Sequence, residues 1–145
     1  MSSDVGNTAA DLAARNKAII LDFLAAQSDG RLSDAGKVVD PNGSWWMLTE
    51  RRTATIGEYY ALWEKLITNQ FPDGLRLDVL DATAEDDRVA VRVESRGVMD
   101  DGTDYNNIYF FQFQLRDGLI VRAWEHGDTA HVWKTLRRRH SDATS

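Results

Sequence analysis

The chain has 145 residues, 43% of them hydrophobic, with five Trp, five Phe and four Tyr, enough for one domain with a core of its own. Its net charge is −6, and this acid excess argues against a nucleic-acid partner. The absence of cysteine excludes disulfides, zinc–thiolate sites and thiol nucleophiles. No run approaches the ~18 apolar residues of a membrane span, and the first residues lack a secretory pattern. We therefore expect a cytoplasmic protein with no membrane partner.

The first half of the chain is predicted to be mainly helical. After a disordered terminus over 1–7, Thr8 is placed to cap a helix with apolar residues at helical spacing, which ends at Gly30. A short second helix follows over 31–39, and Asp40 to Gly43 forms a turn signal. A short strand over 44–48 and a polar loop over 49–55 precede an amphipathic helix over 56–71.

The second half is predicted to consist of antiparallel strands. Alternating residues mark strands at 75–83, 88–99, 103–115 and 119–126, joined by tight turns that contain Asp or Gly. A closing helix over 129–136 follows, and residues 138–145 are expected to be disordered. One α+β domain over 8–137, with its helices on one face of the sheet, fits this order.

Polar groups occur on both faces of the long predicted strands. Arg92, Glu94 and Arg96 share one face of their strand, while Tyr105, Asn107 and Tyr109 share a face with phenylalanines. A sheet with helices on one side and a second subunit on the other would have this pattern. A concave sheet around a cavity with a few polar groups would have it too. Glu94 and Arg96 could instead form an ion pair in water, which stabilises little.

Three segments stand out in the second half of the chain: Gly102-x-x-Tyr105-Asn106-Asn107-x-Tyr109-x-Phe111-x-Phe113, Asp117-Gly118-x-Ile120 and Glu125-His126-Gly127-Asp128. In their order and spacing they resemble the nuclear transport factor 2-like superfamily, in its SnoaL-like and ketosteroid-isomerase-like branch. The resemblance implies a cone-shaped barrel, in which a strongly curved, mostly antiparallel mixed sheet wraps around a long N-terminal helix. It also implies a homodimer through the convex sheet face. Members include isomerases, polyketide cyclases, dehydratases and epoxide hydrolases, so the fold alone does not settle the function.

The resemblance also suggests site residues. Asp40 resembles the general base of the steroid isomerases, although its segment equally reads as a simple turn, and Tyr60 matches a pocket tyrosine. Phe23 and Tyr109 stand where those enzymes place oxyanion donors, and only Tyr109 can donate a hydrogen bond. The Arg-x-Asp pair of the epoxide hydrolases is replaced by Arg92-x-Glu94-x-Arg96.

Asp128 is the residue we expect to act as general acid or base. A carboxyl that faces an aromatic cavity loses water, which favours its neutral form and suits proton transfer near neutrality. His126, two residues earlier, would share its face of the strand, although a lone histidine there is more often structural. The three histidines form no metal-binding cluster with carboxylates, so neither a metal nor another cofactor is expected.

Three functions follow from these patterns. In the first, Asp128, His126, Tyr109 and Asp40 perform acid–base chemistry on a small, largely apolar molecule of a polycyclic or carbonyl-bearing kind. The residues expected to bind it are Phe23, Trp46, Tyr60, Trp63, Glu94, Arg96, Tyr105, Asn107 and Trp124. In the second, the same pocket binds a ligand without turnover. In the third, the protein is an interaction module with a vestigial pocket. Side-chain alternation along the strand does not decide whether Trp45 or Trp46 faces inward, because a register shift of one residue exchanges them.

Overall fold

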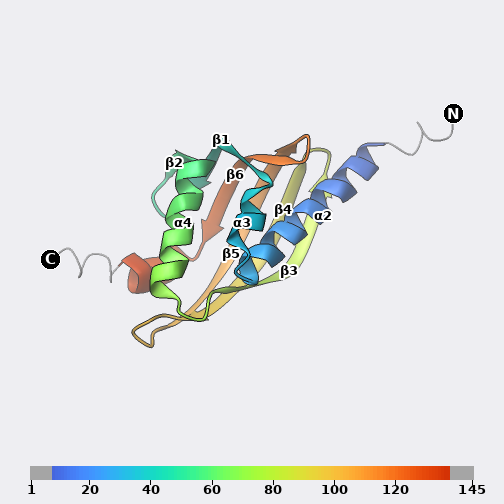
Figure 1. Cartoon of the computed structure of the whole chain (residues 1–145). Helices are drawn as coiled ribbons and strands as arrows, with labels where there is room; N and C mark the ends of the chain where they lie inside the picture. The colour runs from blue at the N-terminus through green and yellow to red at the C-terminus, as the bar shows by residue number, and fades with distance from the viewer. Residues whose placement is uncertain (1–7, 138–145) are drawn as a thin grey trace.

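The computed structural model describes residues 8–137 (Figure 1). The predicted disorder of 1–7 and 138–145 lies outside these residues. The helices are α2 (Ala9–Ser28), α3 (Leu32–Gly36), α4 (Ile56–Gln70) and α5 (Thr129–Val132), which continues into the π-helical turn η1 (Trp133–Arg137). The strands are β1 (Val39–Met47), β2 (Arg52–Thr55), β3 (Arg76–Glu85), β4 (Arg88–Val98), β5 (Asp104–Arg116) and β6 (Leu119–Gly127).

The strands form one mixed sheet in the order β2-β1-β6-β5-β4-β3. Only β1 and β6 pair in parallel, and the other neighbours are antiparallel. The sheet stays open, with β2 and β3 at its edges. The predicted α+β class, with a mixed, mostly antiparallel sheet and a long N-terminal helix, is therefore confirmed.

Both long helices start at threonine caps. Thr8 and Asp11 form a reciprocal capping box at the start of α2, and the Thr55 hydroxyl accepts the Glu58 backbone N–H at the start of α4. Gly30, with φ of +78°, ends the first helix in a conformation that favours glycine. These local signals explain why the helix starts agree with the sequence prediction.

The helices α2, α3 and α4 cover one face of the sheet (Figure 1). The main core between these layers includes Ile20, Phe23, Trp45, Val91 and Phe113. A second, smaller cluster lies under the end of α4 and consists of Ile67, Phe71, Leu75, Met99 and Tyr105. The interior is thus formed by the concave side of the sheet and the helices that it holds.

Two local predictions in the first half are wrong. The Asp40–Gly43 segment is part of β1 rather than a turn outside it, although the Asn42 backbone N–H does bond the Asp40 side chain at 3.0 Å. The predicted polar loop contains the edge strand β2. This strand is stabilised by its pairing with β1, which the strand propensities of its own residues do not reveal.

A β-bulge changes which side chains of β6 face the interior. Gln114 pairs with Arg122 and Leu115 pairs with Ile120, so Val121 is an extra residue in β6. Because each strand residue alternates in direction, one extra residue reverses the parity after it. Ile120 and Ala123 are consequently both buried, and Glu125 follows them inward.

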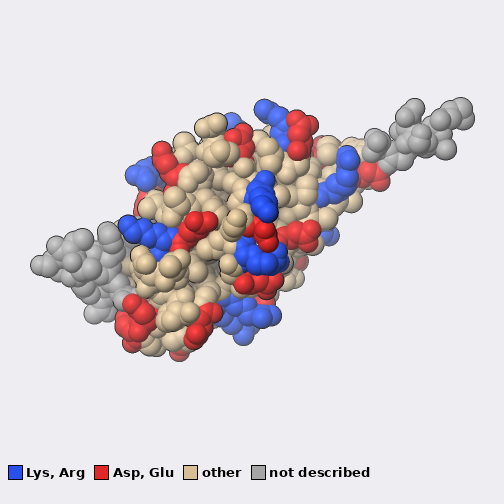
Figure 2. All heavy atoms as spheres, in the orientation of Figure 1, with Lys and Arg blue, Asp and Glu red and all other residues tan. Residues whose placement is uncertain are grey.

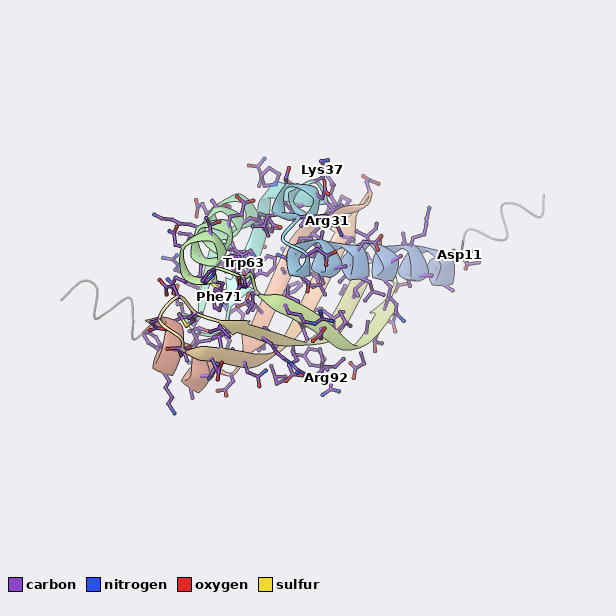
Figure 3. All side chains as sticks on the ribbon, turned by 60° about the horizontal axis from the view of Figure 1, so that its bottom comes forward. Asp11, Arg31, Lys37, Trp63, Phe71 and Arg92 are labelled. Atoms are coloured by element: carbon purple, nitrogen blue, oxygen red, sulfur yellow. The ribbon has the colours of Figure 1, made fainter. Side chains whose placement is uncertain are left out.

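The outer face of the sheet is the side opposite the helices; Arg92 marks it in Figure 3. On β5 it carries Ile108 and Phe110, which are 46% and 49% exposed. The helix-covered side presents charges of both signs that are interspersed (Figure 2). Within the described residues, no helix is long and apolar enough to cross a membrane.

Candidate functional site

The interior contains a carboxylate, Glu125, that is held by two aromatic donors. One oxygen, Oε1, accepts the Trp45 indole N–H at 3.1 Å and the Tyr59 hydroxyl at 2.6 Å. The rings of Trp45 and Tyr59 stack at 4.0 Å with an interplanar angle of 9°. These contacts join β6, β1 and α4, so the carboxylate occupies a position that three separate elements define.

A small cavity lies beside Glu125. Its walls are Leu24, Gln27, Trp45, Tyr59, Trp63, Leu77, Tyr109, Phe111 and Glu125. The space open to the centre of a water molecule is about 20 Å³, which is enough for one water and far below the several hundred Å³ typical of ligand pockets. The cavity is therefore mostly apolar and too small for a ligand larger than water.

Three polar side chains of β5 form a second interior network. The Tyr105 and Tyr109 hydroxyls are hydrogen-bonded to each other, and the Asn107 Nδ2 donates to the Tyr105 hydroxyl at 3.2 Å. Tyr109 lines the cavity, whereas Tyr105 belongs to the second cluster. Gly127 allows this packing, because a Cβ there would lie 2.8 Å from two carbons of the Tyr109 ring.

The orientation of the Asn107 amide is set by backbone donors. Its Oδ1 accepts the N–H groups of Ile108 at 2.8 Å and Asp128 at 3.2 Å. The oxygen is thereby assigned, so the NH₂ group must face Tyr105. Asn107, only 1% exposed, thus connects the start of α5 to the interior tyrosines.

Burial keeps the interior phenols protonated. Desolvation raises the pKa of Tyr59 and Tyr109 well above the ordinary value, and the negative charge of Glu125 adds to both shifts. The pKa of Tyr105 is also raised, again chiefly by burial. All three tyrosines therefore remain neutral hydrogen-bond donors throughout the neutral range.

Four residues predicted for the site belong to this interior. Tyr109 and Trp63 line the cavity, and Tyr105 and Asn107 form the adjoining network. All four lie on β5 or α4, where regular alternation or helical spacing indicated their direction.

Three other predicted residues lie away from the cavity. Phe23 and Tyr60 pack in the main core, where the Tyr60 hydroxyl donates to the Leu32 carbonyl at 3.3 Å. Burial raises the pKa of Tyr60 to about 12. Asp40 lies at the start of β1 and does not line the cavity.

The remaining strand residues lie on the outer face. Trp46, Trp124 and His126 are there, with the Trp46 and His126 rings 5.2 Å apart. Glu94 accepts hydrogen bonds from Arg96 at 2.9 Å and from Asn106 at 3.0 Å. The Asn106 bond, followed by that of Arg96, lowers the Glu94 pKa. This is the solvent-side ion pair that the sequence left open.

Asp128 caps α5. Its Oδ1 accepts the backbone N–H groups of Ala130 at 3.1 Å and His131 at 3.3 Å, and the residue is exposed. It does not line the cavity. The expectation that its carboxyl faces an aromatic cavity is therefore not met by this geometry; the carboxyl found there belongs to Glu125.

Sequence reasoning missed Glu125 and Tyr59, and it left open which of Trp45 and Trp46 faces inward; Trp45 does, with an exposure of 2%. If side chains alternated strictly along β6 from the buried Ile120, those of Trp124, His126 and Asp128 would face inward. The bulge at Val121 reverses this alternation. Tyr59 was visible only as part of an amphipathic helix.

Within residues 8–137, no group of three or more His, Asp or Glu is placed to hold a metal ion.

The matched family model is described as a SnoaL-like domain and covers residues 20–123. Because this range includes more than half of the chain, the protein belongs to the SnoaL-like domain family. Its fold is the nuclear transport factor 2-like cone, as the sequence resemblance implied. No curated protein sequence matches the chain.

Solved structures share the fold at low sequence identity. AclR from Streptomyces galilaeus, provisionally assigned as a hydroxylase, superposes with a TM-score of 0.73 at 24% identity, covering 86% of this chain and 85% of AclR. A provisionally assigned SnoaL-like polyketide cyclase from Jannaschia sp. CCS1 gives 0.72 at 18% identity, with coverage of 86% and 93%. An LEH-like epoxide hydrolase from M. tuberculosis gives 0.71 at 12% identity, with coverage of 87% and 92%.

Proposed function

We propose that this protein binds a small, largely apolar molecule in the interior cavity and performs acid–base chemistry on it with Glu125, without a cofactor. The observation that carries the proposal is the Glu125 carboxylate, which faces a mostly apolar cavity where two aromatic donors hold it. A carboxylate is costly to bury, so its presence among apolar walls favours a use for it. Membership of the SnoaL-like family and the shared fold support a small-molecule role of this kind.

Glu125 is suited to accept a proton from a bound molecule. Its Oε1 accepts hydrogen bonds from Trp45 and Tyr59, and an ionised carboxylate acts as an acceptor through both of its oxygens. The two donors fix its position, which reduces the reorganisation needed during proton transfer. For a carbonyl-bearing substrate, the proton on the adjacent carbon would pass to Glu125 and return to another atom of the product.

Tyr109 is suited to stabilise the oxygen of the substrate. Asn107 donates to the Tyr105 oxygen, and Tyr105 can in turn donate to Tyr109 within their pair. This direction leaves the Tyr109 proton for a molecule in the cavity. Because the raised pKa keeps Tyr109 protonated, it would donate to a developing enolate oxygen.

The test compares two matched amide variants. Wild type, Glu125→Gln and Asp128→Asn would be incubated with a panel of small carbonyl compounds and epoxides, and products followed by mass spectrometry. We expect Glu125→Gln to lose turnover by at least 100-fold, the scale of a general base, while Asp128→Asn retains it. The opposite pattern would return the role to Asp128. If the wild-type protein converts no compound of the panel, the proposal is wrong.

The outer face of the sheet supports a second proposal, that the protein forms a homodimer. Ile108 and Phe110 are about half exposed there, beside the contacting rings of Trp46 and His126. Apolar residues grouped on a sheet face favour a covered surface. Phe110→Asp should convert a dimer to a monomer in light-scattering measurements, whereas Leu62→Asp on α4 should not. A wild-type monomer at high concentration would contradict this proposal.

A further inference from the structure

The closed interior raises the question of how a ligand gains room. The cavity of about 20 Å³ holds no more than one water, so a side chain must leave before a larger molecule can enter. Most of the wall is fixed. Leu24 and Trp45 are each 2% exposed, and Tyr109 and Phe111 are each 8% exposed. Tyr59 is held by its short hydrogen bond to Glu125.

Trp63 differs from the rest of the wall. Its Nε1 is buried and has no hydrogen-bond partner among residues 8–137, whereas the Nε1 of Trp45 donates to Glu125. An unpaired buried donor is unfavourable, and moving it into water would remove that penalty. The closed position of Trp63 is therefore opposed by its own N–H group.

The place of Trp63 in the fold leaves a route outward. It lies one helical turn after Tyr59 on α4 and is only partly buried. It packs at the edges of both hydrophobic clusters rather than inside either, and Figure 3 shows it near Phe71 below α4. A rotation about its side-chain bonds would free the space of a two-ring aromatic group next to Glu125.

We propose that Trp63 is a displaceable plug, and that the site accepts a flat one- or two-ring molecule with a hydroxyl or similar donor directed at Glu125. This inference rests on the proposed function, because it uses the same cavity. The flat shape follows from the indole whose space the ligand takes. The donor follows from Glu125, the anionic acceptor in the wall, while the other walls are mainly aromatic or aliphatic.

The binding test uses 2-naphthol, which has two rings and a hydroxyl donor, and 2-methoxynaphthalene, which lacks the donor. Calorimetry would compare wild type with Trp63→Ala, and with Trp133→Ala as the control, since Trp133 is 53% exposed. We expect Trp63→Ala to bind 2-naphthol at least ten-fold more tightly than wild type, because no side chain must be displaced. Trp133→Ala should match wild type. In Trp63→Ala the methoxy compound should bind at least ten-fold more weakly than 2-naphthol, and adding Glu125→Gln should remove that preference.

A second measurement is made on the wild-type protein, and a substituted protein serves only to assign a resonance. Deuterium exchange of the indole N–H groups, followed by nuclear magnetic resonance, should be faster for Trp63 than for Trp45. Trp63→Phe assigns the resonance. Equal protection of the two indoles, or no gain in affinity for Trp63→Ala, overturns the plug. Equal affinity for the two naphthalenes overturns the ligand chemistry. Loss of turnover in Glu125→Gln is scored separately, so the proposed function can stand if the plug fails.

Discussion

Removing the Tyr59 hydroxyl tests the interior contact on which the site depends. In Tyr59→Phe, Glu125 loses a buried donor at 2.6 Å but keeps Trp45 at 3.1 Å. A hydrogen bond to a charged group contributes about 1.5–3 kcal/mol, so the free energy of unfolding should fall by about that amount. Urea unfolding followed by circular dichroism measures it, with an unchanged m-value showing that the comparison is valid.

Tyr60 supplies the matched control on the same helix. Its hydroxyl donates to the neutral Leu32 carbonyl over 3.3 Å, so Tyr60→Phe should cost only about 0.5–1.5 kcal/mol. A double-mutant cycle of Tyr59→Phe with Glu125→Gln should give a coupling energy of at least about 1 kcal/mol. If Tyr59→Phe costs no more than Tyr60→Phe, the view of Glu125 as a charged group held by Tyr59 is refuted.

Three further results are expected. The pKa values of all four tyrosines are raised in the folded protein. The free energy of unfolding should therefore stay constant up to about pH 10 and fall above it, by up to about 1.4 kcal/mol per pH unit for each tyrosine. Tyrosinate absorbance should appear together with unfolding, and its appearance in the folded protein near pH 10 would contradict this expectation. Gly127→Ala should lower the free energy of unfolding, measured with urea, by about 1–3 kcal/mol because the added Cβ meets the Tyr109 ring. Gly36→Ala, whose added Cβ has its nearest neighbour at 3.7 Å, should lower it by less than about 0.5 kcal/mol. Equal losses in the two variants would refute the steric argument. Asp128→Ala should cost about 1 kcal/mol and Asp128→Asn almost nothing, because asparagine also caps helices; a large loss of stability in Asp128→Asn would show a role beyond capping.

Local chemistry determined which elements could be predicted. Thr8, Thr55 and Gly30 act within a few residues of themselves, so the helix ends were readable from the sequence. The hairpins of β3 to β6 were readable for the same reason. The pairing of β1 with β6 joins residues about 80 positions apart, and no short-range pattern carries that information.

The candidate site was only half predictable. Tyr105, Asn107 and Tyr109 lie on β5, whose alternation is unbroken until Gln114, so their common direction was correct. Glu125 lies after the bulge at Val121, where the alternation reverses. A bulge depends on how two neighbouring strands fit, and Gly43, whose Cβ would lie 2.4 Å from the Val121 carbonyl oxygen, is part of that fit.

The parallel β1–β6 pair also determines when the site can form during folding. Trp45 and Glu125 are 80 residues apart in the chain, and Tyr59 and Glu125 are 66 apart. Contacts of such long range form only after much of the chain has been ordered, which slows folding. Glu125 therefore acquires its donors only when the last strand docks beside the first. A nascent chain whose β6 is still inside the ribosome cannot place Glu125 beside Trp45 and therefore has no site. The indole fluorescence of Trp45 would report the moment at which the site is completed.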